Sequence, residues 1–279
     1  MAKVLIVGCG DLGSAIALLL HQAKHEVVGV RISPQKLPYG MQTIQADVTN
    51  ASLLSALHHL NPAIIIYCVA ASAQSDENYH AHYVQGLKNV LATQTNNASL
   101  QHVFFVSSTR VYGQNTQDLL DETVPAVPAD FGGERLLEAE QVLNHLPCQS
   151  TILRLSGIYG QGRLYLVNTA KDPSRWPVNN GWSNRIHRDD AAGFIAFLVQ
   201  KVFSQQPLER CYIVTDDMPT LQYTVLAWLA IQLGVDVSHI QTPVANGGKR
   251  LSNQRLRATG FQLQYPHYQI GYQKVLETI

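Results

Sequence analysis

Apolar residues along the chain alternate between two patterns. Short segments with a strand-like pattern occupy residues 3–7, 25–32, 41–47, 63–71, 102–107, 150–155 and 211–215. The run over 63–71 is continuously apolar, which is typical of a central strand covered on both faces. Between these segments apolar residues recur every three or four positions. That spacing predicts helices that begin near Leu12 and after Thr49 or Asn50, and helices over 76–96, 131–145, 189–203 and 219–233. Alternating strands and helices predict an α/β fold with a doubly wound parallel sheet.

The regular alternation breaks down in two parts of the second half. Residues 157–186 are rich in glycine, asparagine and aromatic side chains without a clean period, and the chain after residue 233 is loop-rich. We expect these parts to form a small lobe at the carboxyl ends of the strands, where open α/β sheets bind ligands. The predicted sheet domain comprises residues 1–160 and 187–216, and the substrate-binding lobe comprises residues 161–186 and 217–279.

The first apolar run is followed at once by three glycines in the order Gly8, Gly10 and Gly13. Gly8 permits a tight turn, Gly10 lets a pyrophosphate approach the backbone, and Gly13 lets the helix pack closely on the strand. The start of that helix, at Asp11 and Leu12, offers free N–H groups and the positive end of the helix dipole. Glycines also occur in ordinary turns, but this position after a buried N-terminal strand favours a dinucleotide-binding Rossmann domain.

Composition narrows the class of protein. Lys and Arg together number 20, as do Asp and Glu, so the net charge is zero and gives no electrostatic reason to expect nucleic acid or an anionic membrane as partner. The longest apolar run, residues 63–71, is too short to cross a bilayer. The four cysteines lie far apart, so we expect a reduced, cytoplasmic protein. His80 and His82 would point to different faces of a helix, and we expect no metal site.

Arg31 stands at the end of the second predicted strand, where proteins that bind NAD usually place a carboxylate. A guanidinium there predicts a contact to the 2′-phosphate of NADP. The alternative is a solvent-facing arginine, with NAD as the cofactor. No acidic residue nearby replaces the missing carboxylate, and this favours NADP.

Several ordered motifs carry a resemblance to a known family: VGCGDLG, QADVTN, VAAS, VSSTRVYG, ILRLSGIYGQGR, NRIHRDDAA and YIVTDD. Together they resemble the extended and atypical short-chain dehydrogenases/reductases, the NAD(P)-dependent epimerase/dehydratase proteins that act on nucleotide sugars. The resemblance implies that Asp47 and Val48 lie against the adenine. It also implies that the nicotinamide end of the cofactor is lined by Val69, Ala70, Ala71, Leu155 and Ser156.

The same resemblance implies a catalytic group of Asn, Ser or Thr, and a Tyr-x-x-x-Lys pair. In such a pair the tyrosine exchanges a proton with the substrate hydroxyl, and the lysine lowers the tyrosine pKa and holds the ribose. This chain keeps the serine as Ser108. The Tyr and Lys positions fall on Phe131 and Arg135, and the Asn position falls on Tyr83. Three of the four positions are therefore changed.

Other residues could take over parts of this chemistry. Tyr112 follows Ser108 by four positions and is our first candidate for a substitute acid, although most such tyrosines belong to the core or rim. Arg135 could still hold the cofactor ribose; the alternative is an exposed helical arginine paired with Glu138 or Glu134. A second group is expected to be structural: Asp189 and Asp190 as helix N-cap and first-turn residues, and His187 as a packed histidine.

Two functions compete at this point. The first is an NAD(P)-dependent epimerase/dehydratase-like enzyme acting on a nucleotide sugar or related polyol, with Ser108, Tyr112 and Arg135 as its catalytic candidates. The second is a protein that binds NADP with little or no turnover, as a redox-sensing or scaffolding protein. We also expect a homodimer formed through the helices near residues 79–91 and 136–146, because both helices carry more apolar residues than one sheet face requires.

Overall fold

The computed structural model describes residues 2–114 and 116–279, which divide into two compact units. The first, here called the sheet unit, comprises Met1–Gly113, Ala126–Arg154 and Ala192–Tyr212. The second, here called the lobe unit, comprises Gln114–Pro125, Leu155–Ala191 and Ile213–Ile279. The lobe unit thus includes the short segment 114–125, which the apolar pattern had not separated from the sheet.

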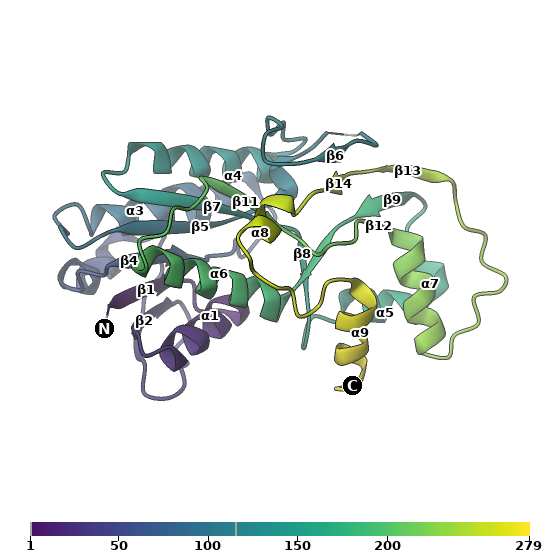
Figure 1. Ribbon diagram of the computed structural model, residues 1–279, viewed down its shortest axis with the longest axis horizontal. Coiled ribbons are helices and arrows are strands. Elements are labelled where there is room, and N and C mark those ends of the chain that lie inside the picture. Colours follow the sequence, from purple (N-terminus) through teal and green to yellow (C-terminus); the bar gives the residue numbers. More distant parts are fainter. Residues whose placement is uncertain (1, 115) are drawn as a thin grey trace. The chain divides into compact units, whose positions relative to one another are not determined.

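A seven-stranded sheet in the order β11-β7-β5-β4-β1-β2-β3 dominates the structure, as Figure 1 shows. Its strands are β1 (Lys3–Val7), β2 (Glu26–Arg31), β3 (Gln42–Gln45), β4 (Ile64–Tyr67), β5 (His102–Ser108), β7 (Gln149–Leu155) and β11 (Cys211–Val214). The β1 strand lies between β2 and β4 and pairs with both in parallel, with Val7 opposite Val30 and Tyr67. The strand order reverses at β1, which makes the carboxyl end of β1 a topological switch point. The predicted α/β, doubly wound parallel sheet is confirmed.

Helices cover the sheet on both faces, with α1 and α6 on one side and α3 and α4 on the other (Figure 1). Their bounds, with those of the short helices, are α1 (Asp11–Gln22), η1 (Ala51–His59), α2 (Asp76–Tyr79), η2 (His80–Gln85), α3 (Gly86–Ala92), η3 (Thr109–Val111), α4 (Phe131–Val142), η4 (Leu143–His145) and α6 (Arg188–Phe203). The helix predicted after Asn50 is a 3₁₀ helix, η1, capped by the Asn50 side chain, which accepts from the Ser52 amide. Most predicted elements are present with shorter ends.

The helix predicted over 76–96 contains a π-helical segment, η2, between α2 and α3. The buried Tyr67, at the end of β4, donates its hydroxyl to the carbonyl of His82 within this segment. Gly86 leaves room for that hydroxyl, because a Cβ there would lie 2.6 Å from Tyr67 Oη. A side chain inserted into the backbone ladder is a known cause of such a bulge, so we attribute η2 to Tyr67.

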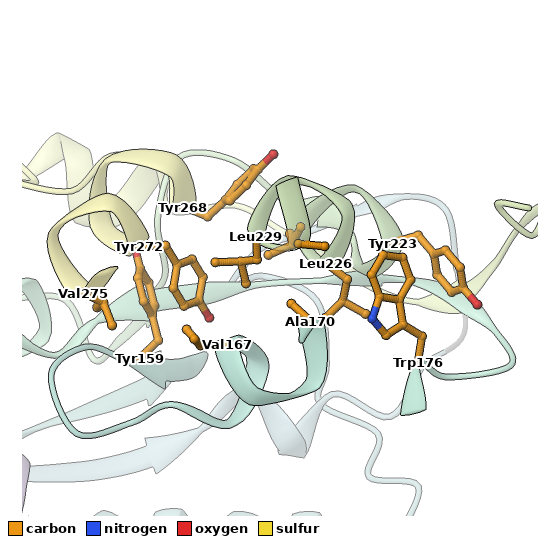
Figure 2. Packing of buried hydrophobic residues seen from close by; sticks show 12 residues of the cluster. Tyr159, Val167, Ala170, Trp176, Tyr223, Leu226, Leu229, Tyr268, Tyr272 and Val275 are labelled. Atoms are coloured by element: carbon orange, nitrogen blue, oxygen red, sulfur yellow. The ribbon is translucent and has the colours of Figure 1, made fainter. Parts of the chain in front are cut away.

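The lobe unit combines short sheets with helices. Its strands pair as β8 (Gly157–Tyr159) with β10 (Arg185–His187), β9 (Asn180–Ser183) with β12 (Thr220–Leu221) and β13 (Ala245–Gly248), and β6 (Leu119–Leu120) with β14 (Arg250–Leu251). Its helices are α5 (Tyr165–Ala170), η5 (Pro173–Arg175), α7 (Gln222–Gln232), α8 (Gln254–Ala258) and α9 (Tyr268–Leu276). Figure 2 shows an aromatic core in which Tyr159 stacks on Tyr272 and Trp176 packs edge-on against Tyr223.

Candidate functional site

The turn between β1 and α1 has the geometry that the three glycines predict. Gly8 has a φ of +96°, and a Cβ on it would lie 2.5 Å from the carbonyl oxygen of Cys68. A Cβ on Gly13 would lie 2.3 Å from the carbonyl oxygen of Gly8. Gly10 is exposed, and a Cβ there would meet nothing within 4 Å. Gly8 and Gly13 are therefore required by the protein's own packing, whereas Gly10 leaves open backbone that an external group can approach.

The first turn of α1 fits a phosphate. Gly10 is the N-cap residue of this 12-residue helix and supplies no side-chain hydrogen bond to it. Asp11 is exposed at the same end, and Leu12 is buried beneath it. Uncapped amides at a helix N-terminus bind anions. The turn could hold the pyrophosphate of a dinucleotide.

Arg31 ends β2 and is held in place by its own loop. Its Nε donates to Ser33 Oγ at 2.8 Å, and its Nη2 donates to Gln35 Oε1 at 3.0 Å. The loop is anchored by the buried Leu37, whose side chain packs where a Cβ on Gly29 would stand. The guanidinium also acts on the buried thiol of Cys9: burial raises the pKa of Cys9 to about 12, and Arg31 opposes that rise. Arg31 thus lies beside the glycine-rich turn.

The ends of β3 and β4 lie at the same carboxyl edge of the parallel sheet. Asp47 Oδ1 accepts from the amide and hydroxyl of Thr49, at 2.9 and 2.8 Å, and Asn89 Nδ2 donates to the carbonyl of Val48 at 2.9 Å. Val69 and Ala71 are half-buried and Ala70 is exposed. These residues keep surface available along the edge, as a bound cofactor would need.

Leu155 and Ser156 belong to the lobe unit and are both buried. Ser156 Oγ donates to Thr215 Oγ1 at 3.0 Å, and the Ser156 amide donates to the carbonyl of Val214 at 3.0 Å. Within this unit the serine joins β7 to the chain that follows β11. Its predicted contact with the nicotinamide stays a prediction.

Arg110 is a candidate site residue that the motif comparison missed. Its amide donates to Ser108 Oγ at 3.1 Å, which shows that the two residues share one turn. Its Nε donates to Asp130 at 2.9 Å, and its Nη1 donates to Gln74 Oε1 at 3.1 Å and to Tyr79 Oη at 2.7 Å. The guanidinium carbon lies 5.1 Å from the ring centre of Tyr79 and 5.3 Å from that of Phe131. A fixed cation therefore lies against the residue that replaces the family's tyrosine.

The first turn of α4 is shaped to receive this arginine. A Cβ on Gly132 would lie 2.4 Å from Arg110 Cζ, and a Cβ on Gly133 would lie 2.6 Å from the Arg110 carbonyl oxygen. Asp130 caps the same helix by accepting from the Gly133 amide at 2.9 Å. The double glycine after Phe131 was the sequence signal for a close neighbour, but it did not identify which residue approaches.

Arg135 lies on the next turn of α4 and is held by two carboxylates. Its Nε and Nη2 donate to the two oxygens of Asp76 at 2.6 and 2.9 Å, and its Nη1 donates to Glu138 Oε2 at 2.8 Å. The hydrogen bond from Arg135 holds the pKa of Asp76 below its usual value. The ion pair with Glu138 is the one that the alternative interpretation predicted, and Asp76 joins it.

Tyr112 is completely buried. Its hydroxyl accepts from Arg154 Nη1 at 2.6 Å, and Arg154 also donates to both oxygens of Glu140, at 3.0 and 2.6 Å. Ser107 Oγ donates to Glu140 Oε1 at 2.7 Å. These contacts give Tyr112 the geometry of a structural tyrosine. A role in proton exchange with a substrate stays a prediction.

The start of α6 carries two acidic residues and directly follows a buried histidine. The helix begins at Arg188, and both oxygens of Asp190 accept from the amides of Gln264 and Tyr265 at 2.8 Å. Asp189 and Asp190 both lie in the first turn of α6, as expected, and the Asp190 carboxylate also fixes a distant loop of the lobe unit. His187 is buried between the rings of Tyr159 and Tyr265, as expected of a packed histidine.

Metal sites and membrane-spanning helices are considered for residues 2–114 and 116–279. Within these ranges no group of three or more histidine, cysteine or acidic side chains could hold a metal ion. No helix in the same ranges is long and apolar enough to cross a membrane.

A family model described as the NAD dependent epimerase/dehydratase family matches residues 4–207. The chain belongs to this family. A solved protein of Methylobacillus flagellatus, named for the NAD-dependent epimerases/dehydratases, is 48% identical to this family member, with 99% of this chain and 98% of that chain covered and a TM-score of 0.91. The family resemblance inferred from the motifs is confirmed.

More distant structures share the fold with this epimerase/dehydratase family member. WbmG of Bordetella bronchiseptica, solved with NAD and UDP, is 17% identical, with 99% and 94% of the two chains covered and a TM-score of 0.79. A dTDP-glucose 4,6-dehydratase of Bacillus anthracis, solved with NAD, is 14% identical, with 99% and 96% covered and a TM-score of 0.79. No match was found among curated proteins.

Proposed function

We propose that this chain binds NADP(H) in the sheet unit and acts as an oxidoreductase of the epimerase/dehydratase type on a nucleotide sugar or related polyol. The NADP(H) part of the proposal rests on the position of Arg31, which Ser33 and Gln35 hold beside the open backbone at Gly10. A guanidinium and a hydroxyl together suit a 2′-phosphate. NAD remains the alternative cofactor, since the solved relatives WbmG and dTDP-glucose 4,6-dehydratase are named as complexes with NAD.

Substitution of Arg31 by aspartate tests the cofactor proposal. The change removes charge-assisted hydrogen bonds worth roughly 1.5–3 kcal/mol and adds repulsion, so the affinity for NADP should fall by about tenfold to a hundredfold while the affinity for NAD is kept or improved. Calorimetric titration with both cofactors measures this. Lys171→Asp, the same charge change at an exposed residue of the lobe unit, should alter neither affinity. Equal affinities for NADP and NAD in the unmutated chain would contradict the proposal.

The substrate class rests on analogy. WbmG was solved with UDP as well as NAD, and the family resemblance includes enzymes that act on nucleotide sugars. Function is decided by the site more than by the fold, so a nucleotide sugar must be tested as substrate directly. The homodimer and the cytoplasmic location expected from the sequence belong to the same proposal.

The second candidate function, cofactor binding with little turnover, is favoured by Phe131 and Arg135. Phe131 has no exchangeable proton, and Arg135 is held by Asp76 and Glu138. Loss of a general acid or base typically lowers a rate by about 10²–10⁴. Incubation with NADP⁺ and UDP-glucose or UDP-galactose, followed by chromatography of the nucleotide sugars, separates the two functions: conversion of the sugar to an epimer or a dehydrated product supports the enzyme, and cofactor binding without conversion supports the second function.

A further inference from the structure

The site lacks a phenol at Phe131, but three tyrosines lie close to the carboxyl ends of β4 and β5: Tyr79, Tyr83 and Tyr112. We propose that Tyr83 is the proton-exchanging residue of this site, with Arg110 as the fixed charge that stabilises its phenolate. The inference rests on the proposed function and names one of its catalytic residues. Tyr83 stands at the family's asparagine position, so its place in the motif does not suggest this role.

Two of the three tyrosines have their hydroxyls committed within the protein. Tyr79 is 6% exposed, and its hydroxyl accepts from Arg110 Nη1 at 2.7 Å and donates to Gln74 Oε1 at 3.1 Å. Tyr112 is 0% exposed, and its hydroxyl accepts from Arg154. Neither side chain offers an exchangeable proton at the surface of the site.

Tyr83 differs in both respects. It is half-buried, and its hydroxyl oxygen accepts from the Ala71 amide at 3.4 Å. Within residues 2–114 and 116–279, the structure gives its hydroxyl proton no acceptor. Ala71 follows β4 in the segment that the family resemblance assigns to the nicotinamide end of the cofactor. The phenol is therefore anchored by its oxygen beside that segment while its proton stays available.

The backbone bulge contributes to this placement. Tyr83 lies in the π-helical segment η2, which Tyr67 widens by its hydrogen bond to the His82 carbonyl. Tyr83 packs against Tyr79 with ring centres 5.3 Å apart, and Tyr79 packs edge-on against Phe131 at 5.4 Å. A continuous aromatic contact thus runs from the vacated tyrosine position to Tyr83.

Charges around Tyr83 act in opposite directions. Burial raises its pKa, and Tyr79 and Cys68 add to the rise, whereas the Ala71 amide and the Arg110 guanidinium lower it. Tyr67 also interacts with it, from the end of β4. Burial outweighs the two lowering effects, so the pKa of Tyr83 stays above its ordinary value, and the Arg110 guanidinium, which packs on the Tyr79 ring beside Tyr83, limits that rise. A cationic oxidised nicotinamide next to the phenol would shift the balance further toward the phenolate.

Oxidation of a substrate alcohol at this site removes a hydride from its carbinol carbon and a proton from its hydroxyl. A bound oxidised nicotinamide would supply the acceptor for the hydride, two electrons and one proton, that leaves the carbinol carbon. The Tyr83 phenolate takes the hydroxyl proton, the C–O single bond becomes a carbonyl, and Tyr83 then returns its proton to water. In the reverse direction Tyr83 donates the proton to the carbonyl oxygen.

A pH titration of phenolate absorbance tests the placement without any substrate. The difference between the unmutated chain and Tyr83→Phe isolates one ionisation among the 12 tyrosines. Saturating NADP⁺ should move that ionisation to lower pH by about one unit, because an opposite charge has come within a few ångströms. NADPH, whose nicotinamide is neutral, should not. Tyr165→Phe is the matched control, since Tyr165 is 75% exposed in the lobe unit and its ionisation should not respond to either cofactor.

Turnover tests the role. Tyr83→Phe should lower the conversion of UDP-glucose or UDP-galactose to product about 10²–10⁴-fold with cofactor affinity unchanged. Arg110→Gln should raise the pH at which Tyr83 ionises and shift the pH profile of turnover the same way. If NADP(H) binds but the Tyr83 ionisation does not move, this inference fails and the cofactor proposal stands. Turnover that persists in Tyr83→Phe, or that is absent from the unmutated chain, also overturns the inference. If neither cofactor binds, both proposals fail.

Discussion

Two buried arginines, one in each unit, differ in how completely their side chains are hydrogen-bonded. In the sheet unit, Arg154 donates to both oxygens of Glu140 and to Tyr112, so its three nitrogens all have partners at 2.6–3.0 Å. In the lobe unit, Arg185 donates to Ser183 Oγ at 2.6 Å, while its Nη1 has no hydrogen-bond partner among the residues that the structure describes. The nearby Asp216 likewise has one oxygen, Oδ2, without a partner there.

The difference changes how each unit responds to mutation and to pH. A buried ion pair with full hydrogen bonding is hard to disturb by pH but costly to break. A buried carboxyl whose hydrogen bonding is incomplete is instead pushed toward its neutral form. Burial raises the pKa of Asp216 to about 7, and the charge of Arg185 opposes that rise without cancelling it. Burial also raises the pKa of Asp190 and Glu122 in the same unit.

The largest effect should come from breaking the buried ion pair between Arg154 and Glu140. Glu140→Gln removes the charge that compensates Arg154, which remains buried, and should lower the free energy of unfolding by about 3–5 kcal/mol. Urea unfolding measures the loss. Glu138→Gln is the matched control: this glutamate also accepts from an arginine, but on the partly exposed surface of α4, and the change should cost less than about 1 kcal/mol. Equal effects of the two variants would show that burial does not govern the cost.

The next effect is a dependence of stability on pH in the lobe unit. Because the pKa of Asp216 is about 7 in the folded chain and 3.8 is its ordinary value, the folded state binds a proton that the unfolded state has released. The stabilisation is complete below about pH 4 and is lost as the pH rises through about 7. Asp216→Asn cannot ionise, so between about pH 5 and about pH 8 it should gain about 3 kcal/mol of stability relative to the unmutated chain. A difference that stays flat across this range would contradict the raised pKa.

The fold could be read from the chain because apolar runs and helical spacing are local properties. Residues 3–7 and 102–107 became β1 and β5, and the glycines at 8, 10 and 13 took the conformations expected of them. The helix over 76–96 was predicted without its π-helical segment. That bulge depends on Tyr67, a residue of another element, and no periodicity within the helix reports it.

The candidate site was predictable only where a motif fixes residue positions. Arg110 could not be found this way, because its contacts to Asp130, Gln74 and Tyr79 join four separate segments. Tyr83 was noticed only as a departure from asparagine. Likewise, the sequence placed Asp190 correctly in the first turn of its helix but could not show that Gln264 and Tyr265 fold back onto its carboxylate.

The smallest effect on stability is expected for Arg135, which is paired with carboxylates, as Arg154 is, but is much less buried. Arg135 makes a two-point contact to Asp76 and another bond to Glu138, and about a third of its side chain is exposed. Solvent screens exposed pairs, so Arg135→Gln should leave the free energy of unfolding nearly unchanged. The same variant reports on the cofactor. If Arg135 serves only these ion pairs, Arg135→Gln should not change the calorimetric affinity for NADP. A drop of tenfold or more would show that Arg135 gives up its contact with Asp76 and binds the cofactor ribose instead.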